Sequence, residues 1–297
     1  MANLKPILVA VIGTGMIGMD LISKIHRSPL LECGLVAGRN PGSEGLQYAA
    51  GLGYRTSSDG IDVVVAAARP FDVVFDATNA HSHLEHWNLL EPLGTLVIDL
   101  TPSRLGEMVV PTVTGTRIPN RRNLSLISCG GQASVPIAHA LGRQFSARYI
   151  EVVTTAASSI VGRATRLNLD EYVETTQHAV SVFSGVRDTK AMVNISAAVP
   201  PTIFRVALSA EILGANAATV HAAVAAAAEE VRAFAPGYAV TACTVTDERV
   251  SVVVEVTATS EFMPRYAGNL DIINAAAILV AEQYAAMQNS AAASQMG

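Results

Sequence analysis

The 297-residue sequence has few charged residues, few aromatic residues and only three cysteines. Charged residues make up 15% of the chain and hydrophobic residues 50%, a balance that excludes general disorder. The formal net charge of −5 provides no electrostatic footprint for nucleic acid. Apolar runs such as residues 63–68 are too short to span a bilayer, which needs about 20 residues. We therefore expect a globular protein that binds neither nucleic acid nor a membrane.

Cysteine usage and the start of the chain bear on where the protein resides. Cys33, Cys129 and Cys243 are odd in number and far apart in sequence, which favours a reduced protein without disulfides. The first residues lead directly into an apolar strand pattern and show no signal-peptide pattern. Together these features predict a cytoplasmic protein.

The first third of the chain alternates between strand and helix patterns. Continuous apolar runs are typical of strands that are buried on both faces of a parallel sheet. Such runs occupy residues 7–12, 32–37, 72–76 and 95–99, and helical patterns occupy residues 17–27 and 45–52. The alternation predicts an α/β fold with a Rossmann-type, doubly wound parallel sheet.

The pattern changes after Cys129, where strands outnumber long helices. Strand patterns cover residues 149–157, 190–197, 203–208, 238–246 and 250–257, and helical patterns cover residues 132–143, 169–183, 217–234 and 270–286. This distribution predicts a second, α+β domain with a mixed or antiparallel sheet. We assign residues 1–130 and 269–297 to a dinucleotide-binding domain, and residues 131–268 to a catalytic and dimerisation domain.

A glycine-rich motif follows the first predicted strand and opens the first helix. The motif is G-x-G-x-x-G, and its members are Gly13, Thr14, Gly15, Met16, Ile17 and Gly18. The first glycine permits a tight turn, the second lets a pyrophosphate approach the backbone, and the third allows close packing of helix and strand. In this context the motif predicts dinucleotide binding, whereas a glycine-rich turn without a ligand is the alternative.

The end of the second predicted strand bears on the choice between NAD and NADP. NAD sites usually carry Asp or Glu there, which binds the ribose hydroxyls. This chain has Arg39 and Asn40 instead, followed by Ser43. Arg39 can pair with a 2′-phosphate and Ser43 can donate a hydrogen bond to it, which favours NADP over NAD. The alternative is that Arg39 is simply exposed to solvent.

Cys129 is the candidate nucleophile because it lies where an apolar run turns into a helical pattern. Backbone N–H groups and the positive end of a helix dipole stabilise a thiolate at such a turn. A thiolate beside a nicotinamide can add to an aldehyde, lose hydride and keep the acyl group as a thioester. Gln132 and the amides of Gly130 and Gly131 are candidate oxyanion donors. The alternative is an inert cysteine in a buried turn.

Two further groups of side chains are candidates for ligand binding. His81, His83 and His86 have metal-like spacing, but we expect them on a helix without a common focus, and we predict no metal site. Arg163 and Arg166 follow a predicted strand and can hold phosphate or carboxylate. For both groups the alternative is a solvated loop.

Several motifs along nearly the whole chain resemble those of one enzyme family. They are residues 10–18, Phe75-Asp76-Ala77-Thr78, Ile98-Asp99-Leu100-Thr101-Pro102, Cys129-Gly130-Gly131-Gln132-Ala133, Asp170-Glu171, Glu174-Thr175-Thr176, Pro200-Pro201, Pro236-Gly237-Tyr238 and Tyr266-Ala267-Gly268-Asn269-Leu270-Asp271-Ile272. The chain resembles the acylating acetaldehyde dehydrogenases that partner a metal-dependent 4-hydroxy-2-oxovalerate aldolase. The resemblance implies oxidation of a short aldehyde with NAD and transfer of the acyl group to coenzyme A.

The resemblance also implies roles for individual residues. Cys129 matches the acyl-thioester cysteine of the family. The implied cofactor contacts outside the glycine-rich motif are Thr78, Asn269 and a second segment that contributes Ser159, Ile160, Gly162, Arg163 and Asn168. A homodimer or larger oligomer, a possible aldolase partner and a place in aromatic hydrocarbon catabolism are implied as well.

The chain departs from the family pattern at four places, one of which is a shorter segment between Tyr238 and Val250. Arg39 and Asn40 stand where the family has Ile-Asp, and residues 160–166 replace Ser-Ala-Gly-Pro-Gly-Thr-Arg. Val206 stands where the family has an Asp that is an acid/base candidate. Valine cannot move a proton, so that role is vacant or is filled by water or by His83. These departures predict a divergent member with a different acyl group, acceptor or cofactor, or with reduced activity.

The leading expectation is an NAD(P)-dependent acylating aldehyde dehydrogenase that acts through Cys129, and the same residues also allow the reverse reduction of an acyl thioester. Two alternatives remain open. One is a semialdehyde dehydrogenase of the acyl-phosphate type, which uses phosphate in place of coenzyme A. The other is a nucleotide-binding partner of an aldolase with reduced catalytic ability.

Overall fold

The computed structural model describes residues 5–115 and 122–296, with the side chains of residues 163–164 and 292–296 outside the description. The chain divides into two compact units. Unit 1 comprises residues 1–107, 116–126 and 274–297, and unit 2 comprises Met108–Gly115 and Ile127–Ile273. The expected boundaries at residues 130 and 269 therefore differ from these by a few residues. Cys129 and Asn269 both belong to unit 2.

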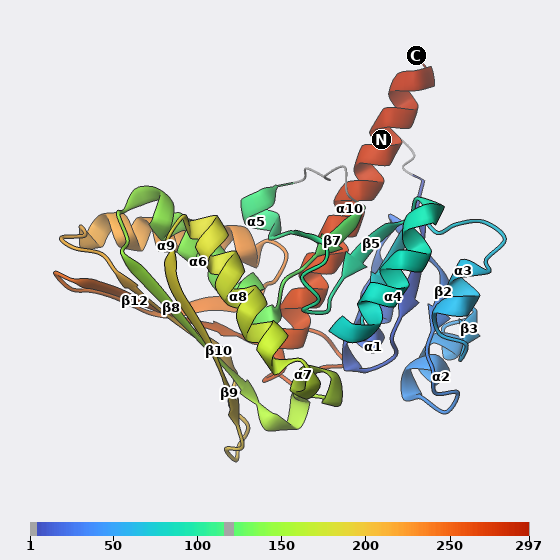
Figure 1. Ribbon diagram of the computed structural model, residues 1–297, viewed down its shortest axis with the longest axis horizontal. Coiled ribbons are helices and arrows are strands. Elements are labelled where there is room, and N and C mark those ends of the chain that lie inside the picture. Colours follow the sequence, from blue (N-terminus) through green and yellow to red (C-terminus); the bar gives the residue numbers. More distant parts are fainter. Residues whose placement is uncertain (1–4, 116–121, 297) are drawn as a thin grey trace. The chain divides into compact units, whose positions relative to one another are not determined.

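Unit 1 is built on a seven-stranded sheet in the order β3-β2-β1-β4-β5-β7-β6 (Figure 1). The strands are β1 (Ile7–Ile12), β2 (Leu31–Ala37), β3 (Thr56–Ser57), β4 (Val73–Asp76), β5 (Leu96–Asp99), β6 (Glu107–Met108) and β7 (Asn123–Ser125). The pairings of β1 with β2 and β4, of β2 with β3, and of β5 with β4 and β7 are parallel. The Rossmann-like sheet predicted from the sequence is confirmed.

Helices connect these strands because parallel neighbours need crossover connections. They are α1 (Met16–Arg27), α2 (Glu44–Gly51), α3 (Ile61–Val65), α4 (Ala80–Leu90) and the 3-10 turn η1 (Glu91–Leu93). The last helix, α10 (Gly268–Met296), connects no strands, and its part from Asn274 onward belongs to unit 1. Ile61 of α3 and Trp87 of α4 pack in one cluster with Ala10 and Ile12 of β1. Val9 and Val11 point to the other face and are also fully buried. Both faces of the sheet are thus covered, as in a doubly wound fold.

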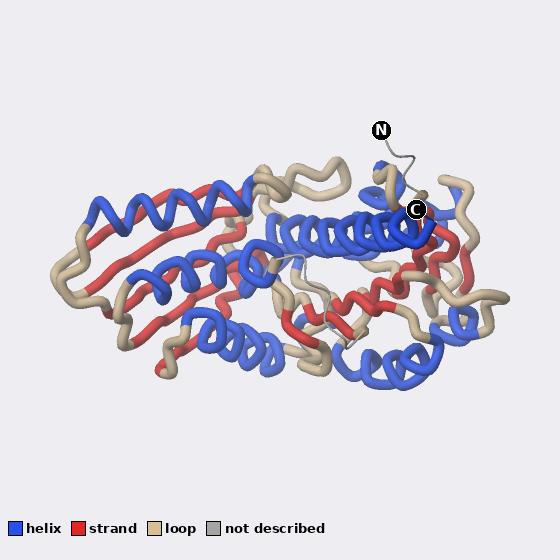
Figure 2. The backbone as a smooth tube through the Cα atoms, turned by 90° about the horizontal axis from the view of Figure 1, so that it is seen from above, coloured by secondary structure: helices blue, strands red, loops and turns tan. Residues whose placement is uncertain are grey.

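Helix α10 is the longest helix in the part of the chain that is described, and Figure 2 shows it running beside the sheet of unit 1. Asn274 Nδ2 donates to Ile17 O at 3.1 Å and to Asp20 Oδ2 at 2.7 Å, which joins α10 to α1. By length and composition alone, Gly268–Ala291 would be able to cross a membrane, but 67% of its most apolar stretch is buried inside the protein. That burial is the pattern of a core helix, so the helix is weak evidence for a membrane span.

Unit 2 contains a five-stranded mixed sheet in the order β11-β12-β10-β8-β9. Its strands are β8 (Tyr149–Ala157), β9 (Asp188–Ser196), β10 (Phe204–Glu211), β11 (Tyr238–Val245) and β12 (Arg249–Val256). Its helical segments are α5 (Pro111–Thr114), α6 (Cys129–Gln144), the 3-10 turn η2 (Ser158–Ile160), α7 (Arg163–Leu167), α8 (Leu169–Ser184) and α9 (Ala217–Arg232). The predicted second α+β domain is confirmed.

The two faces of the unit 2 sheet differ in burial. In β8, β10 and β12 buried residues alternate with partly exposed ones, the pattern of a sheet covered on one face. Figure 1 shows α6, α8 and α9 on the covered face. The open face carries an apolar row of Val153, Ala207 and Val253, which are register partners across three strands.

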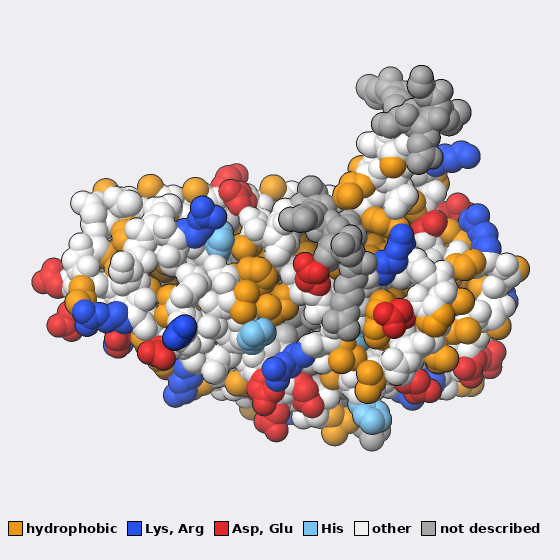
Figure 3. Space-filling view, turned by 45° about the horizontal axis from the view of Figure 1, so that its top comes forward, with side chains coloured by type: hydrophobic (Ala, Val, Ile, Leu, Met, Phe, Trp, Pro, Cys, Tyr) orange, Lys and Arg blue, Asp and Glu red, His pale blue; other side chains and the backbone are white. Residues whose placement is uncertain are grey.

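The molecular surface mixes charges of both signs. On the face seen in Figure 3, Lys and Arg side chains are interspersed with Asp and Glu side chains among neutral groups. This distribution agrees with the modest net charge of −5. The visible face therefore has the mixed character of an ordinary protein surface.

Candidate functional site

The glycine-rich motif forms a tight turn between β1 and α1. Gly13 has a φ of 105°, in the region that side chains disfavour, and a Cβ at Gly18 would collide with Gly13 O. Gly15 precedes the first turn of α1 and makes no side-chain cap, so no capping side chain covers the helix start. Backbone amides at such a helix start bind phosphate groups. The turn thus has the geometry that a dinucleotide pyrophosphate requires.

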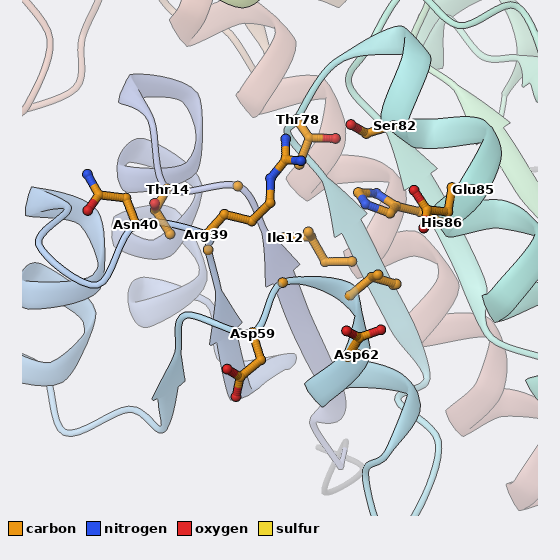
Figure 4. A pocket seen from close by; sticks show the side chains of 14 residues that line it. Ile12, Thr14, Arg39, Asn40, Asp59, Asp62, Thr78, Ser82, Glu85 and His86 are labelled. Carbon is orange, nitrogen blue, oxygen red and sulfur yellow. The ribbon is translucent and has the colours of Figure 1, made fainter.

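A cavity of about 400 Å³ opens beside this turn in unit 1. Its lining comes from four consecutive strand ends and the elements that follow them: Ile12, Gly13, Thr14, Gly38, Arg39, Asn40, Asp59, Gly60, Ile61, Asp62, Thr78, Ser82, Glu85 and His86. In an open parallel sheet, ligands bind outside these carboxyl ends. In Figure 4 Arg39 extends across the cavity toward Thr78, whereas Asn40 points away from it.

Two parts of the predicted cofactor set lie elsewhere. Ser43 does not line the cavity; its Oγ accepts from Leu46 N at 3.3 Å and lies 3.0 Å from Thr14 Oγ1. Its observed contact is the cap of α2, and the hydrogen bond to a 2′-phosphate expected of it stays a prediction. Gly15, Met16, Ile17 and Gly18 shape the turn without lining the cavity.

The cavity also holds carboxylates that the sequence analysis missed. Asp59, Asp62 and Glu85 line it, and Arg39 is the one lysine or arginine among its lining residues in the described chain. Asp59 and Asp62 flank Gly60, whose φ of 62° turns the chain between β3 and α3. Gly60, which lies between Asp59 and Asp62, was the only sign in the sequence that these carboxylates line a ligand cavity. The sign was easy to miss, because the acidic residue of a NAD site usually follows the second strand.

A buried cluster of titratable side chains lies at the ends of β4 and β5. His83 Nδ1 and His86 Nδ1 both contact Asp76 Oδ2, at 2.8 Å and 2.7 Å, and Thr78 Oγ1 donates to Asp76 Oδ1 at 2.5 Å. Burial alone would raise the pKa of Asp76, but the hydrogen bonds from the two histidines hold it well below its usual range. The prediction that the histidines on α4 share no focus is wrong, because two of them converge on one carboxylate.

The second carboxylate of this cluster behaves in the opposite way. Asp99 lies 3.5 Å from His83 Nε2 and is fully buried. Burial raises the pKa of Asp99 to about 6, and the charge of Asp76 adds to the rise. His83 has a raised pKa because, although burial lowers it, the hydrogen bond to Asp76 and the charge of Asp99 favour its protonated form. Among the described residues no group of histidine, cysteine and acidic side chains could hold a metal ion.

In unit 2, Cys129 is the first residue of α6. Ser128 caps the helix by accepting from Gly131 N at 2.9 Å, and its hydroxyl lies 2.6 Å from Thr176 Oγ1 of α8. Cys129 is partly exposed, whereas Cys33 is buried. The expected position of Cys129 at a helix start is confirmed, although the helix begins three residues earlier than the pattern indicated.

Electrostatics at the thiol differ from the expectation. Burial raises the pKa of Cys129 above its ordinary value. Contacts with the Tyr172 hydroxyl, with the amides of Gly130 and Cys129 itself, and with the Asn269 side chain lower it without cancelling the effect of burial. The stabilisation of a thiolate expected at this helix start is therefore opposed by the burial of the sulfur.

The three expected oxyanion donors are already engaged. Gly130 N donates to Tyr172 Oη at 2.9 Å, and Gly131 N donates to Ser128 Oγ. Gln132 is buried, and its Nε2 donates to Val109 O at 2.7 Å, which fastens the segment Met108–Gly115 to α6. In this structure Gln132 therefore has a structural contact, and the oxyanion role predicted for it is not supported.

Tyr172 is a site residue that the sequence analysis missed. Its Oη lies 3.4 Å from Cys129 Sγ, and its side chain is buried. Burial raises the pKa of Tyr172 well above its ordinary value, and the neighbouring Cys129 raises it further. The signal was weak, because a tyrosine in the first turns of a predicted helix has many structural uses.

The predicted second cofactor segment lies in unit 2. Ser159 is exposed, Ile160 and Asn168 are buried, and Gly162 is exposed at the start of α7. The side chain of Arg163 lies outside the described residues. Arg166 donates to Val161 O at 3.0 Å and to Ser158 O at 3.1 Å. Arg166 therefore closes this loop on itself, and its expected role as an anion ligand stays a prediction.

Comparison with known proteins adds sequence evidence to this geometry. A family model described as prokaryotic acetaldehyde dehydrogenase, dimerisation, matches residues 129–264, and one described as semialdehyde dehydrogenase, NAD binding domain, matches residues 8–118. An acetaldehyde dehydrogenase of Streptomyces griseus subsp. griseus is 65% identical over 278 residues, which are 94% of this chain and 90% of the relative. The chain belongs to the acetaldehyde dehydrogenase family.

Two further comparisons extend this result. An acetaldehyde dehydrogenase of Pectobacterium atrosepticum is 42% identical over 293 residues, covering 97% of this chain and 99% of the relative. The solved structure of aspartate semialdehyde dehydrogenase II from Vibrio cholerae matches with a TM-score of 0.64 over 94% of this chain and 98% of that one. At 13% identity the latter likeness concerns the fold alone. The protein is thus an aldehyde dehydrogenase, an oxidoreductase with a NAD-binding domain.

Position 206 holds valine, which cannot carry a proton, where the resemblance implies an Asp. Val206 of β10 is buried and pairs with Thr154 of β8, so the two side chains share the face covered by the helices. His83 does not fill the vacancy, because its two ring nitrogens contact Asp76, Asn123 and Asp99 within unit 1. The expectation that His83 supplies the missing role is not supported.

Proposed function

We propose that the protein is an acylating aldehyde dehydrogenase that oxidises a short-chain aldehyde and passes the acyl group from Cys129 to coenzyme A. The observation that carries the proposal is the surroundings of Cys129 Sγ, where two backbone amides, the Tyr172 hydroxyl and the Asn269 side chain meet the sulfur. Membership of the acetaldehyde dehydrogenase family supports a short aldehyde as the substrate.

In the proposed reaction the Cys129 thiol loses its proton to water and the thiolate attacks the aldehyde carbon. A C–S bond forms, and the carbonyl electrons move to oxygen, where the amide of Cys129 and the Asn269 side chain are the proposed donors. A nicotinamide cofactor, when bound, would supply the hydride acceptor for this carbon, and the residues of this chain would hold the thiohemiacetal in place for the transfer. The thiol of coenzyme A then loses its proton to water and attacks the thioester on Cys129. The Cys129 sulfur leaves with the electrons of the C–S bond and takes a proton back from water.

The cofactor site is the proposed role of the cavity in unit 1. The uncapped start of α1 suits the pyrophosphate, and Arg39 suits a 2′-phosphate, so we propose that NADP is accepted alongside or ahead of NAD. Asn269 Oδ1 is buried without a hydrogen-bond partner among the described residues. This acceptor suits an amide N–H such as that of the nicotinamide carboxamide, and it supports the cofactor role proposed for Asn269.

A homodimer is proposed through the open face of the unit 2 sheet. The apolar row of Val153, Ala207 and Val253 lies on this face, and the ion pair of Arg205 with Glu255, at 2.7 Å, lies beside it. The family model that covers this unit is itself described as a dimerisation domain. We further propose a cytoplasmic enzyme that receives its aldehyde from an aldolase partner in aromatic hydrocarbon catabolism.

The decisive experiment supplies aldehydes of two to six carbons with NAD or NADP, with and without coenzyme A, and measures reduced cofactor together with acyl thioester. We expect reduction that depends on coenzyme A and a loss of at least about 10³-fold in Cys129→Ser, the scale seen when a covalent nucleophile is removed. Cys243→Ser, a partly exposed cysteine elsewhere in unit 2, is the matched control. Activity with phosphate in place of coenzyme A would instead indicate an acyl-phosphate reaction. Absence of any turnover beside a stable aldolase complex would indicate a binding partner.

A further inference from the structure

We propose that Tyr172 is a catalytic residue whose hydroxyl donates a hydrogen bond to the Cys129 thiolate, both when it attacks and when it departs. This inference rests on the proposed thioester function of Cys129. It assigns a residue to the place where the chain has no carboxylate, because position 206 holds valine.

The direction of the Tyr172 proton follows from its contacts. Gly130 N has only a proton to give, so Tyr172 Oη is the acceptor in their 2.9 Å hydrogen bond. The phenol then has one proton of its own, and Cys129 Sγ lies 3.4 Å from the oxygen. Sulfur in its thiolate form can only accept. The hydrogen bonds therefore run from Gly130 N–H to Tyr172 Oη, and from Tyr172 O–H to Cys129 Sγ.

Tyr172 is held in place from its backbone as well as from its hydroxyl. Thr176 Oγ1 donates its hydroxyl proton to Tyr172 O at 2.6 Å, so Thr176 Oγ1 can only accept in its other hydrogen bonds. The hydroxyl of Ser128, 2.6 Å from Thr176 Oγ1, must then donate to it, while Ser128 Oγ accepts from Gly131 N. This oriented chain joins the cap of α6 to α8. It fixes the phenol relative to the sulfur, which a hydrogen bond in a reaction requires.

The sheet contributes a second polar group beside the same hydroxyl. Thr154 Oγ1 is buried, and its interaction with the Tyr172 hydroxyl lowers the pKa of that hydroxyl, against the larger effect of burial. A Cβ at Gly130 would lie 2.5 Å from both Thr154 Oγ1 and Tyr172 Oη, so the two hydroxyls border the same small space. Val206 pairs with Thr154 across the strands and lies on the same face. The polar groups that approach Cys129 from this side are therefore hydroxyls, not a carboxylate.

The Tyr172 hydroxyl acts as a hydrogen-bond donor to the Cys129 sulfur and not as a base. Burial holds the pKa of the Tyr172 hydroxyl well above its ordinary value, so this hydroxyl stays protonated. A protonated hydroxyl cannot be the base that removes the proton of the Cys129 thiol. It therefore keeps its proton and lowers the energy of the negative sulfur. During attack the charge moves from sulfur to the carbonyl oxygen and the hydrogen bond weakens. During transfer to coenzyme A the C–S bond breaks, charge returns to sulfur, and the hydrogen bond strengthens again.

The test measures the reactivity of Cys129 without any turnover. In a Cys243→Ser background, the rate of alkylation by iodoacetamide is followed between pH 6 and 10.5, since Cys33 is buried and its pKa is raised to about 12. We expect Tyr172→Phe to move the midpoint of this profile upward by about one pH unit, the size of a lost hydrogen bond to the charged form. Tyr54→Phe, which alters a tyrosine of unit 1, is the matched control and leaves the midpoint in place.

A second variant separates a chemical role from a structural one. Replacing Tyr172 with 3-fluorotyrosine keeps the shape of the side chain and makes its hydroxyl a stronger donor, so we expect the alkylation midpoint to move downward. If the alkylation midpoint is unchanged in both variants, the proposal is overturned. This holds even if Tyr172→Phe is less stable than the parent protein, because stability and the midpoint are separate measurements. A shifted midpoint without coenzyme A-dependent turnover in the parent protein would overturn the proposed function and leave the contact established. Coenzyme A-dependent turnover together with unchanged midpoints would support the proposed function and overturn the role of Tyr172.

Discussion

Thr14 Oγ1 and Ser43 Oγ lie 3.0 Å apart, and this contact ties the glycine-rich turn to the start of α2. Gly45 adds to the closeness, because a Cβ at that position would collide with Thr14 O. Ser43 also caps α2 by accepting from Leu46 N. The loop that carries Arg39 is therefore anchored at its far end to the phosphate-binding turn.

Replacing Ser43 separates anchoring from phosphate recognition. We expect Ser43→Ala to lower the free energy of unfolding by about 1 kcal/mol, the usual cost of losing a helix cap. It should change the KM values for NAD and NADP by the same factor, because Ser43 does not line the cavity. Urea unfolding and steady-state kinetics measure the two effects. A rise confined to the KM for NADP would show that Ser43 binds the 2′-phosphate after all.

Arg39 should set the cofactor preference. We expect Arg39→Ala to reduce kcat/KM for NADP by about 10-fold to 100-fold, the effect of losing a charge-assisted contact worth about 1.5–3 kcal/mol. The value for NAD should change little, because NAD has no 2′-phosphate. Arg55→Ala is the matched control, since Arg55 is exposed in unit 1 and is not among the residues that line the cavity. An equal loss with both cofactors would remove Arg39 as a specificity residue.

The buried His83 should make stability depend on pH. Its pKa lies above the ordinary value of 6.5, so its contribution to folding is fully present below pH 6.5 and is lost as pH rises through the higher folded value. We therefore expect the free energy of unfolding to fall as the pH rises above 6.5. His83→Gln should be less stable at pH 6 and show a flatter slope in that range. His221→Gln, on the exposed face of α9, should keep the slope of the parent protein.

The open sheet face provides a prediction about assembly. Val153 is the β8 member of the apolar row, where an arginine would place a charge in the proposed dimer interface. We expect the parent protein to sediment as a dimer or larger species, and Val153→Arg to sediment as a monomer. Ala226→Arg, exposed on α9, should leave the assembly unchanged. A monomeric parent protein in analytical ultracentrifugation would contradict the proposed interface.

Local signals predicted most of the fold. The apolar run at residues 7–12 is β1, the glycine motif is the turn after it, and residues 149–157 are β8, because these patterns depend on neighbouring residues. The apolar run at residues 63–68 does not form a strand, because its first residues belong to the end of the short helix α3 (Ile61–Val65). A short apolar run does not by itself distinguish a strand from a buried helix.

The parts of the site that escaped prediction depend on distances between remote segments. His83 and His86 converge on Asp76 because α4 packs back over the end of β4, and sequence spacing alone does not reveal this. The oxyanion role expected of Gln132 depended on free donors, but its Nε2 is engaged by Val109 O. For Cys129 the helix dipole was visible in the sequence, whereas the burial that outweighs it was not.

The small space shared by Gly130, Tyr172 and Thr154 restricts the order in which this chain can change. An alanine at position 130 would meet both hydroxyl oxygens at 2.5 Å, so it is barred while the phenol is present. Once Tyr172 has become Phe and Thr154 has become a smaller residue, the same alanine has room. The three positions are therefore sterically coupled, and glycine at position 130 is the condition for keeping both hydroxyls beside Cys129.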